Sequence, residues 1–223
     1  MIGVFDSGIG GMSVLRALRA QLPDEDFKYI ADTEHAPYGE RDEAFVAERS
    51  RAITRELVEV HGAKLVVVAC NTATAAAIHL LRREFPSIPF VGVEPPIKPA
   101  LAITRTKNVG VMATRGTLAS AKFESLMRSV EGMGVNFVLQ PCDGLAHAIE
   151  TKDAVRTREL FGRYVGAIRA QAHVDTLVLG CTHYALEEEM LREIAGPGIE
   201  LIEPGPAVAK RVKALALTPG LRI

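Results

Sequence analysis

The chain has 223 residues, of which 48% are hydrophobic and 24% charged, and its formal net charge is −1. This length allows one large domain or two small ones, while the charge excludes a basic nucleic-acid surface and a polybasic membrane anchor. No apolar run approaches the roughly 18 residues of a membrane span. Because the first residues show a strand pattern and three cysteines do not form a disulfide framework, we expect a cytoplasmic protein without a signal peptide.

Short apolar runs alternate with amphipathic stretches along the whole chain. Strands are predicted at 2–5, 27–31, 64–69, 90–93, 108–113, 136–140, 176–180 and 200–203. Helices are predicted near 12–21, 40–61, 72–84, 117–130, 153–172, 185–195 and 205–216. Near-continuous Val, Ile and Leu runs are typical of strands that helices cover on both faces. The pattern therefore predicts an α/β fold with mainly parallel sheets.

Two units of the sequence occur twice. One is a strand, a small-residue turn and a helix, and the other is an apolar strand that ends at a cysteine. The similar pairs are 2–18 with 109–126 and 65–78 with 177–190. Gly3 precedes Cys70 by 67 residues, and Gly110 precedes Cys181 by 71. The repetition predicts two pseudo-symmetric α/β domains with the active site at their interface.

Prolines mark the expected crossovers between these domains. GVEPPIKPA at 92–100 marks the passage into the second domain, and IEPGPA at 202–207 marks the return to the first. We therefore predict that residues 1–94 and 205–223 form the first domain and that residues 95–204 form the second.

Cys70 and Cys181 each follow a predicted strand and precede a helix. Ligands of open α/β sheets bind beyond the carboxyl ends of the strands, so both thiols should face one crevice. The N-terminus of a helix also lowers the pKa of a thiol. Two cysteines in equivalent positions favour a chemical role over simple packing. Cys142 has no such counterpart, and we interpret it as structural.

Different chemistries would use these two thiols differently. Cys181-x-His183 with a remote Cys70 matches no usual metal-ligand spacing, and a Cys–His nucleophile needs only one thiol. Reversible disulfide chemistry usually uses a C-x-x-C pair, which the sequence lacks. Inversion of a carbon centre needs a base on one face and a chemically similar acid on the other. Two thiols satisfy this requirement, and we expect no metal and no cofactor.

Each thiol has a candidate proton partner. His183 follows Cys181 by two residues and titrates near neutral pH. Asp6 ends the first predicted strand, which should lie beside the strand that leads to Cys70. We therefore interpret Asp6 and His183 as groups that hold or relay a proton.

The turn after the first strand raises a different hypothesis. Gly8-x-Gly10-x-x-Ser13 approaches the dinucleotide fingerprint, and Asp32 stands near the place of its ribose-binding acid. The carboxylate of Asp6 at the strand end would repel a pyrophosphate. We therefore interpret the turn as part of a site for a small acidic substrate, with Asp32 starting a loop that closes over it.

Six ordered motifs resemble the glutamate racemase family of the aspartate/glutamate racemase superfamily. They are GVFDSGIGG (3–11), ADTEHAPYGER (31–41), VVACNTATA (67–75), VGVEPPIKPA (91–100), VGVMATRGT (109–117) and LVLGCTHY (177–184). The resemblance covers essentially the whole chain. It implies a cofactor-independent enzyme of the bacterial cytoplasm that interconverts L- and D-glutamate and supplies D-glutamate for peptidoglycan. It also implies a homodimer with neither membrane nor direct nucleic-acid contact, and in some members a contact with DNA gyrase.

The resemblance implies roles for particular residues. Cys70 would abstract the α-proton of D-glutamate with the help of Asp6. Cys181 would abstract that of L-glutamate with the help of His183 and of Glu150, which lies eight positions after a cysteine as in the family. Substrate binding is implied for Asp6, Ser7, Tyr38, Gly39, Asn71, Thr72, Thr114, Thr117, Thr182 and His183.

The sequence departs from the family at several positions, and rival functions remain open. Ala185 stands where a proline is usual, Phe123 where a tyrosine is usual, and the segment around His147 is more polar. These departures affect the expected pocket rim and oligomer contacts. The alternatives are a racemase or isomerase of aspartate, hydantoins or maleate, a racemase-like protein that binds gyrase, and a nicotinamide-dependent dehydrogenase.

Overall fold

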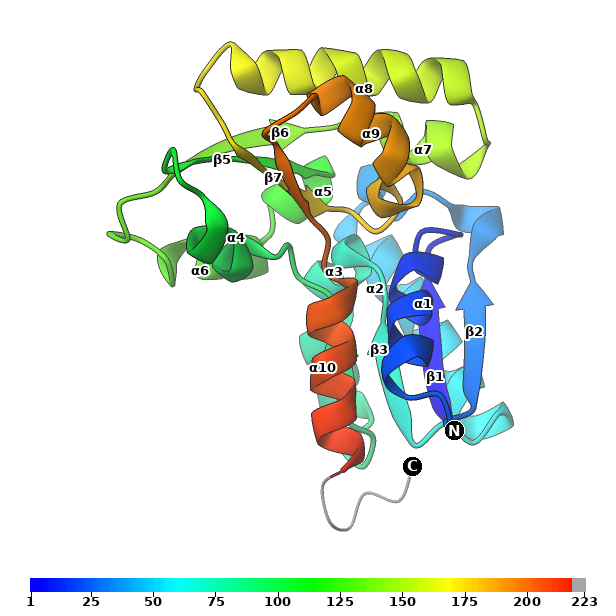
Figure 1. The fold of residues 1–223 in the computed structure, drawn as a ribbon. Coiled ribbons are helices and arrows are strands. Elements are labelled where there is room, and N and C mark those ends of the chain that lie inside the picture. The colour runs from blue at the N-terminus through cyan, green and yellow to red at the C-terminus, as the bar shows by residue number, and fades with distance from the viewer. Residues whose placement is uncertain (218–223) are drawn as a thin grey trace.

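Two four-stranded sheets form the framework of the chain, and the computed structural model describes residues 1–217. Every strand pairs in parallel with its neighbours, in the orders β2-β1-β3-β4 and β6-β5-β7-β8 (Figure 1). The strands are β1 (Ile2–Asp6), β2 (Phe27–Ala31), β3 (Leu65–Val68), β4 (Phe90–Gly92), β5 (Asn108–Ala113), β6 (Asn136–Pro141), β7 (Thr176–Gly180) and β8 (Glu200–Ile202). Each predicted strand is present, so the prediction of an α/β fold with parallel sheets is confirmed.

The second sheet repeats the topology of the first. Within each sheet the first strand lies between the second and the third, so β1 corresponds to β5 and β3 to β7. Gly3 of β1 pairs with Val66 of β3, and Gly110 of β5 pairs with Leu177 of β7. The pseudo-symmetry predicted from the sequence repeat is therefore confirmed in the order of the strands.

Helices connect the strands and cover both faces of each sheet. Side chains of α2 and α3 share a core with one face of the first sheet, and those of α1 and α10 share a core with the other. The second sheet is covered by α7, α8 and α9 on one face and by α4 and α6 on the other. The helices are α1 (Met12–Gln21), α2 (Glu43–Arg55), α3 (Asn71–Glu84), α4 (Ile97–Ile103), α5 (Arg115–Leu118), α6 (Ala121–Arg128), α7 (Leu145–Glu150), α8 (Ala154–Arg169), α9 (Glu188–Ala195) and α10 (Gly205–Ala216), with the short turns η1 (Thr33–His35), η2 (Tyr38–Glu40), η3 (Glu56–Val60) and η4 (Tyr184–Glu187). Across residues 1–217, each helix is too short or too polar to cross a membrane.

Helices α4 and α7 lie outside the predicted ranges, and the predicted helix near 117–130 is divided into α5 and α6. The first turn of α4 contains Pro99, which a helix tolerates there because first-turn N–H groups need no partner within the helix. Helix α7 begins after Gly144, whose φ is 76°, and has six residues, too few for a periodic pattern. The predicted helix near 117–130 is split because the Ser120 hydroxyl accepts from the N–H of Phe123 and starts α6.

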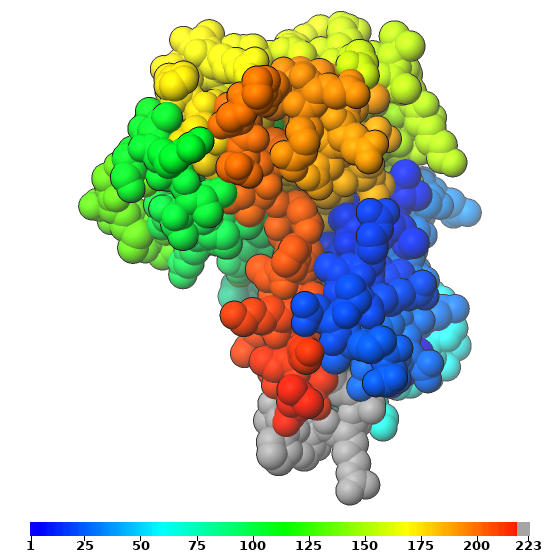
Figure 2. Space-filling model, in the orientation of Figure 1, coloured from blue at the N-terminus to red at the C-terminus, as the bar shows by residue number. Residues whose placement is uncertain are grey.

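The chain forms two lobes. Residues of the blue and red ends lie side by side in one lobe, and the green to orange residues form the other (Figure 2). Helix α10 returns to the first lobe, where Val208 and Val212 share a core with Val14 and Leu18 of α1. The boundaries 1–94 with 205–223 and 95–204 stay a prediction, and residues 218–223 lie outside the described part of the chain.

Replacing Gly110 by alanine should destabilise the second lobe. A Cβ at this position would lie 2.6 Å from Cδ2 of Leu177 and 2.9 Å from Cγ2 of Ile168, so α8 would have to shift. We expect a loss of about 1–3 kcal/mol in the free energy of unfolding, measured by urea denaturation. Gly166→Ala is the control, because this exposed glycine of α8 has open space around it, and alanine should stabilise the helix by about 0.5–1 kcal/mol. Equal stability of the two variants would contradict this account of the packing.

Candidate active site

The carboxyl ends of β1, β3, β5 and β7 meet between the two lobes. Asp6 ends β1, Cys70 follows β3, Thr114 follows β5 and Cys181 follows β7. Several contacts cross between the lobes here: the Thr182 hydroxyl donates to Oδ2 of Asp6 over 3.5 Å, and the hydroxyl oxygens of Thr72 and Thr114 lie 3.0 Å apart. Both cysteines are buried beside this contact zone, and one crevice facing both thiols stays a prediction.

Cys70 lies at the N-terminus of α3, beside Asp6 and Ser7. Its sulfur accepts from the N–H of Ala73 at 3.4 Å and lies 3.9 Å from the Ser7 hydroxyl. The fully buried carboxylate of Asp6 accepts from the N–H groups of Ser7 at 2.8 Å and Gly11 at 2.5 Å. This half of the site therefore combines a thiol, a hydroxyl and a carboxyl group that protein donors hold in place.

The pKa of the Cys70 thiol is raised, contrary to the prediction from its position at a helix N-terminus. Burial raises this pKa well above its ordinary value, and the nearby Asp6 charge raises it further, while the N–H of Ala73 lowers it only in part. The pKa of Asp6 is raised as well, because burial outweighs the proximity of His183 and the hydrogen bonds from the turn. Burial beside Asp6 therefore favours the thiol form of Cys70 over the thiolate.

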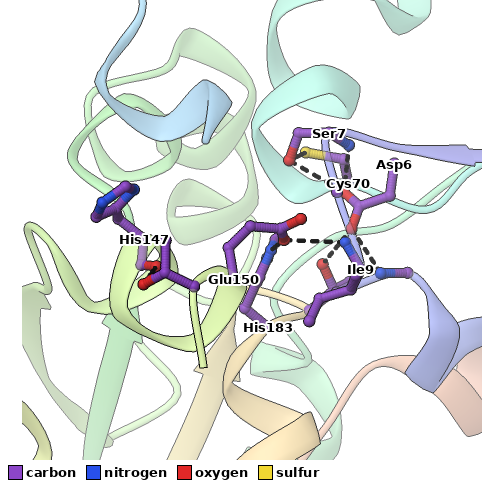
Figure 3. A network of polar contacts seen from close by, with 12 residues as sticks. Asp6, Ser7, Ile9, Cys70, His147, Glu150 and His183 are labelled. Carbon is purple, nitrogen blue, oxygen red and sulfur yellow. Dashed lines mark hydrogen bonds and ion pairs between the residues drawn. The ribbon is translucent and has the colours of Figure 1, made fainter. Parts of the chain in front are cut away.

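Cys181 lies at the start of a chain of polar contacts. Its sulfur is 3.8 Å from Nδ1 of His183, and Nε2 of His183 is 2.6 Å from Oε2 of Glu150. The same Glu150 oxygen accepts from the N–H of Ile9 at 2.9 Å (Figure 3). The structure therefore brings together Cys181, His183 and Glu150, and the side chain of Glu150 is 12% exposed.

The charges of His183 and Glu150 stabilise one another. Burial lowers the pKa of His183, but the contacts with Cys181 and Glu150 outweigh burial and raise it well above its ordinary value. Burial raises the pKa of Glu150, but the hydrogen bonds from His183 and Ile9 outweigh it and lower the pKa below its ordinary value. An imidazolium between a sulfur and a carboxylate results, and such an imidazolium can stabilise a thiolate.

A group of short polar side chains lies beside the thiols. The Thr114 hydroxyl donates to the Thr117 hydroxyl at 3.0 Å, and Thr72 contacts both. Asn71 is 4% exposed, yet neither atom of its side-chain amide has a hydrogen-bond partner among residues 1–217. Because a buried amide without partners is costly, this side chain is suited to a polar ligand.

The glycines of the first turn allow the two lobes to approach. A Cβ on Gly8 would overlap the Glu150 carboxylate, and one on Gly10 would overlap the His183 ring. The N–H groups of Ser7, Ile9 and Gly11 already donate to Asp6 or Glu150. The turn thus resembles an anion-binding loop because it binds carboxylates of the protein itself. The interpretation of the turn as part of a site for a small acidic substrate stays a prediction.

The predicted loop from Asp32 to Gly39 is held in part by Arg49, a residue that the motifs did not single out. The Tyr38 hydroxyl donates to Asp32 at 2.5 Å, and the guanidinium of Arg49 donates to both oxygens of Asp32. The backbone of Gly39 lies against Thr114, where a Cβ would come within 2.6 Å of Cγ2. Arg49 was missed because an arginine on an amphipathic helix is an ordinary surface feature.

Tyr29 is the second site residue that sequence reasoning missed. Its hydroxyl donates to the carbonyl oxygen of Gly8 at 2.6 Å and lies close to Gly11. Tyr29, which lies in β2, therefore holds the glycine turn in place through this hydrogen bond. Its position in an apolar strand pattern gave no signal of this contact. Within residues 1–217, the site included, no group of three or more His, Cys, Asp or Glu side chains is arranged to hold a metal ion.

The sequence and the fold are both similar to those of known proteins. The family model described as Asp/Glu/Hydantoin racemase matches residues 2–212. A glutamate racemase of Ectopseudomonas mendocina is 47% identical over 216 residues, which are 96% of this chain and 81% of that protein.

Two solved structures are also similar. One is Escherichia coli glutamate racemase in complex with L-glutamate and the activator UDP-MurNAc-Ala, with a TM-score of 0.88, 36% identity and coverage of 96% of this chain and 81% of that one. The other is the Francisella tularensis enzyme in complex with D-glutamate, with a TM-score of 0.81, 27% identity and coverage of 99% and 82%. The chain belongs to the Asp/Glu/Hydantoin racemase family and, within it, groups with the glutamate racemases.

Proposed function

We propose that the chain interconverts L- and D-glutamate by proton transfer at the α-carbon between Cys70 and Cys181, without a cofactor. The observation that carries the proposal is the pair of buried thiols at equivalent strand ends of the two lobes, each with its own proton partner. The glutamate bound in the E. coli and F. tularensis structures supports the choice of substrate.

In the direction from L- to D-glutamate, the Cys181 thiolate takes the α-proton. The C–H bond breaks, an S–H bond forms, and the electron pair stays on the α-carbon. The Cys70 thiol then gives its proton to the opposite face and becomes a thiolate. The imidazolium of His183 stabilises the Cys181 thiolate before the step, and the protonated state of Cys70 suits it to donate.

The reverse direction exchanges these roles. Cys70 must then lose its proton before it can act as a base, and Asp6 is the nearby group suited to take or orient that proton. Burial raises the pKa of Asp6, so its carboxylate is a better proton acceptor than an exposed aspartate. On the other side, His183 with Glu150 supplies the proton that Cys181 needs for the next cycle.

Neutral donors would hold the substrate. The side-chain amide of Asn71 has no hydrogen-bond partner within residues 1–217, and the hydroxyls of Thr72, Thr114, Thr117 and Thr182 lie at the same strand ends. Neutral donors leave the charge of the α-carbanion to be stabilised by a water-poor, hydrogen-bonded site. Ser7, Tyr38, Gly39, Asp6 and His183 complete the proposed binding set.

The biological setting is also part of the proposal. We propose that the product D-glutamate serves peptidoglycan synthesis in the bacterial cytoplasm, consistent with three free cysteines. A homodimer and a contact with DNA gyrase stay predictions that no contact of this single chain tests.

Racemisation in D2O should label the product and not the substrate. With two bases, the proton removed from L-glutamate stays on Cys181 while solvent deuterium from Cys70 enters D-glutamate. Early in the reaction, without added cofactor, we expect α-deuterium in the D-isomer and almost none in the remaining L-isomer, measured by chiral chromatography with mass spectrometry. Turnover of aspartate instead of glutamate would overturn the substrate, and equal labelling of both isomers would overturn the two-base mechanism.

Substitution of either thiol should abolish racemisation. We expect Cys70→Ala and Cys181→Ala to lower kcat by at least about 10³-fold, since each removes a group that must act as acid or base. Cys142→Ala is the matched control, because Cys142 is also buried, its thiol donates to the carbonyl oxygen of Gln140 at 3.3 Å, and the proposed mechanism gives it no proton to transfer. Full activity in either of the first two variants would contradict the mechanism.

Glu150→Gln should lower the pKa of His183. The Glu150 carboxylate raises this pKa in the native chain, and a neutral amide cannot do so to the same extent. A histidine with a raised pKa stabilises the fold below about pH 6.5, its unfolded value, and this contribution is lost as the pH rises through the native pKa. NMR titration of the six histidines, with His183→Asn for assignment, measures the shift. An unchanged pKa would exclude the proposed coupling.

A further inference from the structure

The carboxylate of Asp32 has three protein partners at the edge of the site. Its Oδ1 accepts from Nη2 of Arg49 at 2.8 Å, and Oδ2 accepts from Nε of Arg49 at 2.9 Å. The Tyr38 hydroxyl donates to Oδ2 at 2.5 Å, and Nδ1 of His35 lies 2.9 Å from Oδ1. Arg49 comes from α2, Tyr38 from η2 and His35 from η1, so one buried carboxylate joins three segments.

This ion pair differs from the surface pairs of the chain. The Asp32 side chain is 8% exposed and that of Arg49 is 31% exposed. Two residues further along α2, Arg51 makes a similar bidentate pair with Glu84, but there the side chains are 42% and 33% exposed. Removing one partner of a buried pair leaves an uncompensated charge, whereas a surface pair contributes little. The position of the Asp32 carboxylate thus depends on Arg49.

The segment that Asp32 holds is one of those by which the first lobe contacts the second. Tyr38 is buried in η2, Gly39 lies against Thr114, and Glu40 accepts from the N–H of Gly144 at 2.9 Å. Because the single proton of the Tyr38 hydroxyl goes to Asp32, this side chain can only accept from a substrate. The turn can therefore offer a substrate carboxylate only backbone donors, and their placement depends on the position of Tyr38.

We propose that Arg49 is a positioning residue for substrate binding, which acts through Asp32 on Tyr38 and the turn at 38–40. The inference rests on the proposed function, since it concerns where glutamate is held. Arg49 touches neither thiol nor the relay of His183 and Glu150 in any hydrogen bond of the described chain. Its contribution therefore lies in substrate affinity and not in proton transfer.

Steady-state kinetics of paired variants test this role. We expect Arg49→Met to raise the KM for glutamate by about tenfold or more and to change kcat by less than about threefold, the pattern of lost binding. Arg49→Lys keeps the charge but not the bidentate geometry, and should restore part of the loss. Arg51→Met, the control on the same helix, should leave both constants within about twofold of wild type.

A double-mutant cycle separates positioning from general destabilisation. If Arg49 acts through Tyr38, then Arg49→Met should raise KM much less in a Tyr38→Phe background than in the wild-type background. Thermal unfolding of each variant is followed in parallel. If the two substitutions multiply their separate effects on KM, the inference is overturned. It is also overturned if Arg49→Met and Arg51→Met have the same KM. Wild-type protein that does not racemise glutamate would overturn the proposed function itself, so the two failures are distinguishable.

Discussion

The hydrogen bonds to the Glu150 carboxylate are the interaction on which the geometry of the site depends. One oxygen of this carboxylate accepts from the backbone of Ile9 in the first lobe and contacts His183 in the second. The bond to His183 fixes the imidazole against Cys181, and the bond to Ile9 fixes the turn that also carries Asp6. This half-buried carboxylate therefore links the turn that carries Asp6 to the imidazole beside Cys181. The turn can approach Glu150 and His183 this closely only because Gly8 and Gly10 have no Cβ, which would overlap these two side chains.

The two halves are alike in topology but not in the partners they give to the thiols. Cys70 lies beside a carboxyl group and a hydroxyl, and its pKa is raised by burial. Cys181 lies beside an imidazole whose charge a carboxylate stabilises. The two thiols therefore have different environments, and the proposed mechanism uses Cys70 as the acid and Cys181 as the base in the direction from L- to D-glutamate. A duplicated scaffold with different partners is thus suited to a reaction that needs an acid and a base of the same chemical type on opposite sides of one atom.

Much of the fold and the centre of the site could be predicted from the sequence. Parallel strands bring their carboxyl ends to one edge, so Cys70, Cys181 and Asp6 could be grouped from their positions alone. The pKa of Cys70 could not, because the prediction counted the helix N-terminus but not burial beside Asp6. Arg49 and Tyr29 carry no motif, and their contacts depend on how α2 and β2 lie against loops distant in sequence. Helix α7, which delivers Glu150, is too short to leave a periodic pattern.

The proposed mechanism requires one α-carbon to lie between the two thiols, which a crystal structure with bound D-glutamate would show. The account predicts that the sulfurs of Cys70 and Cys181 lie on opposite faces of the α-carbon, each in line with a proton position, and that the amide of Asn71 binds a substrate carboxylate. A structure in which both sulfurs face the same side of the amino acid, or in which glutamate binds away from them, would contradict the account.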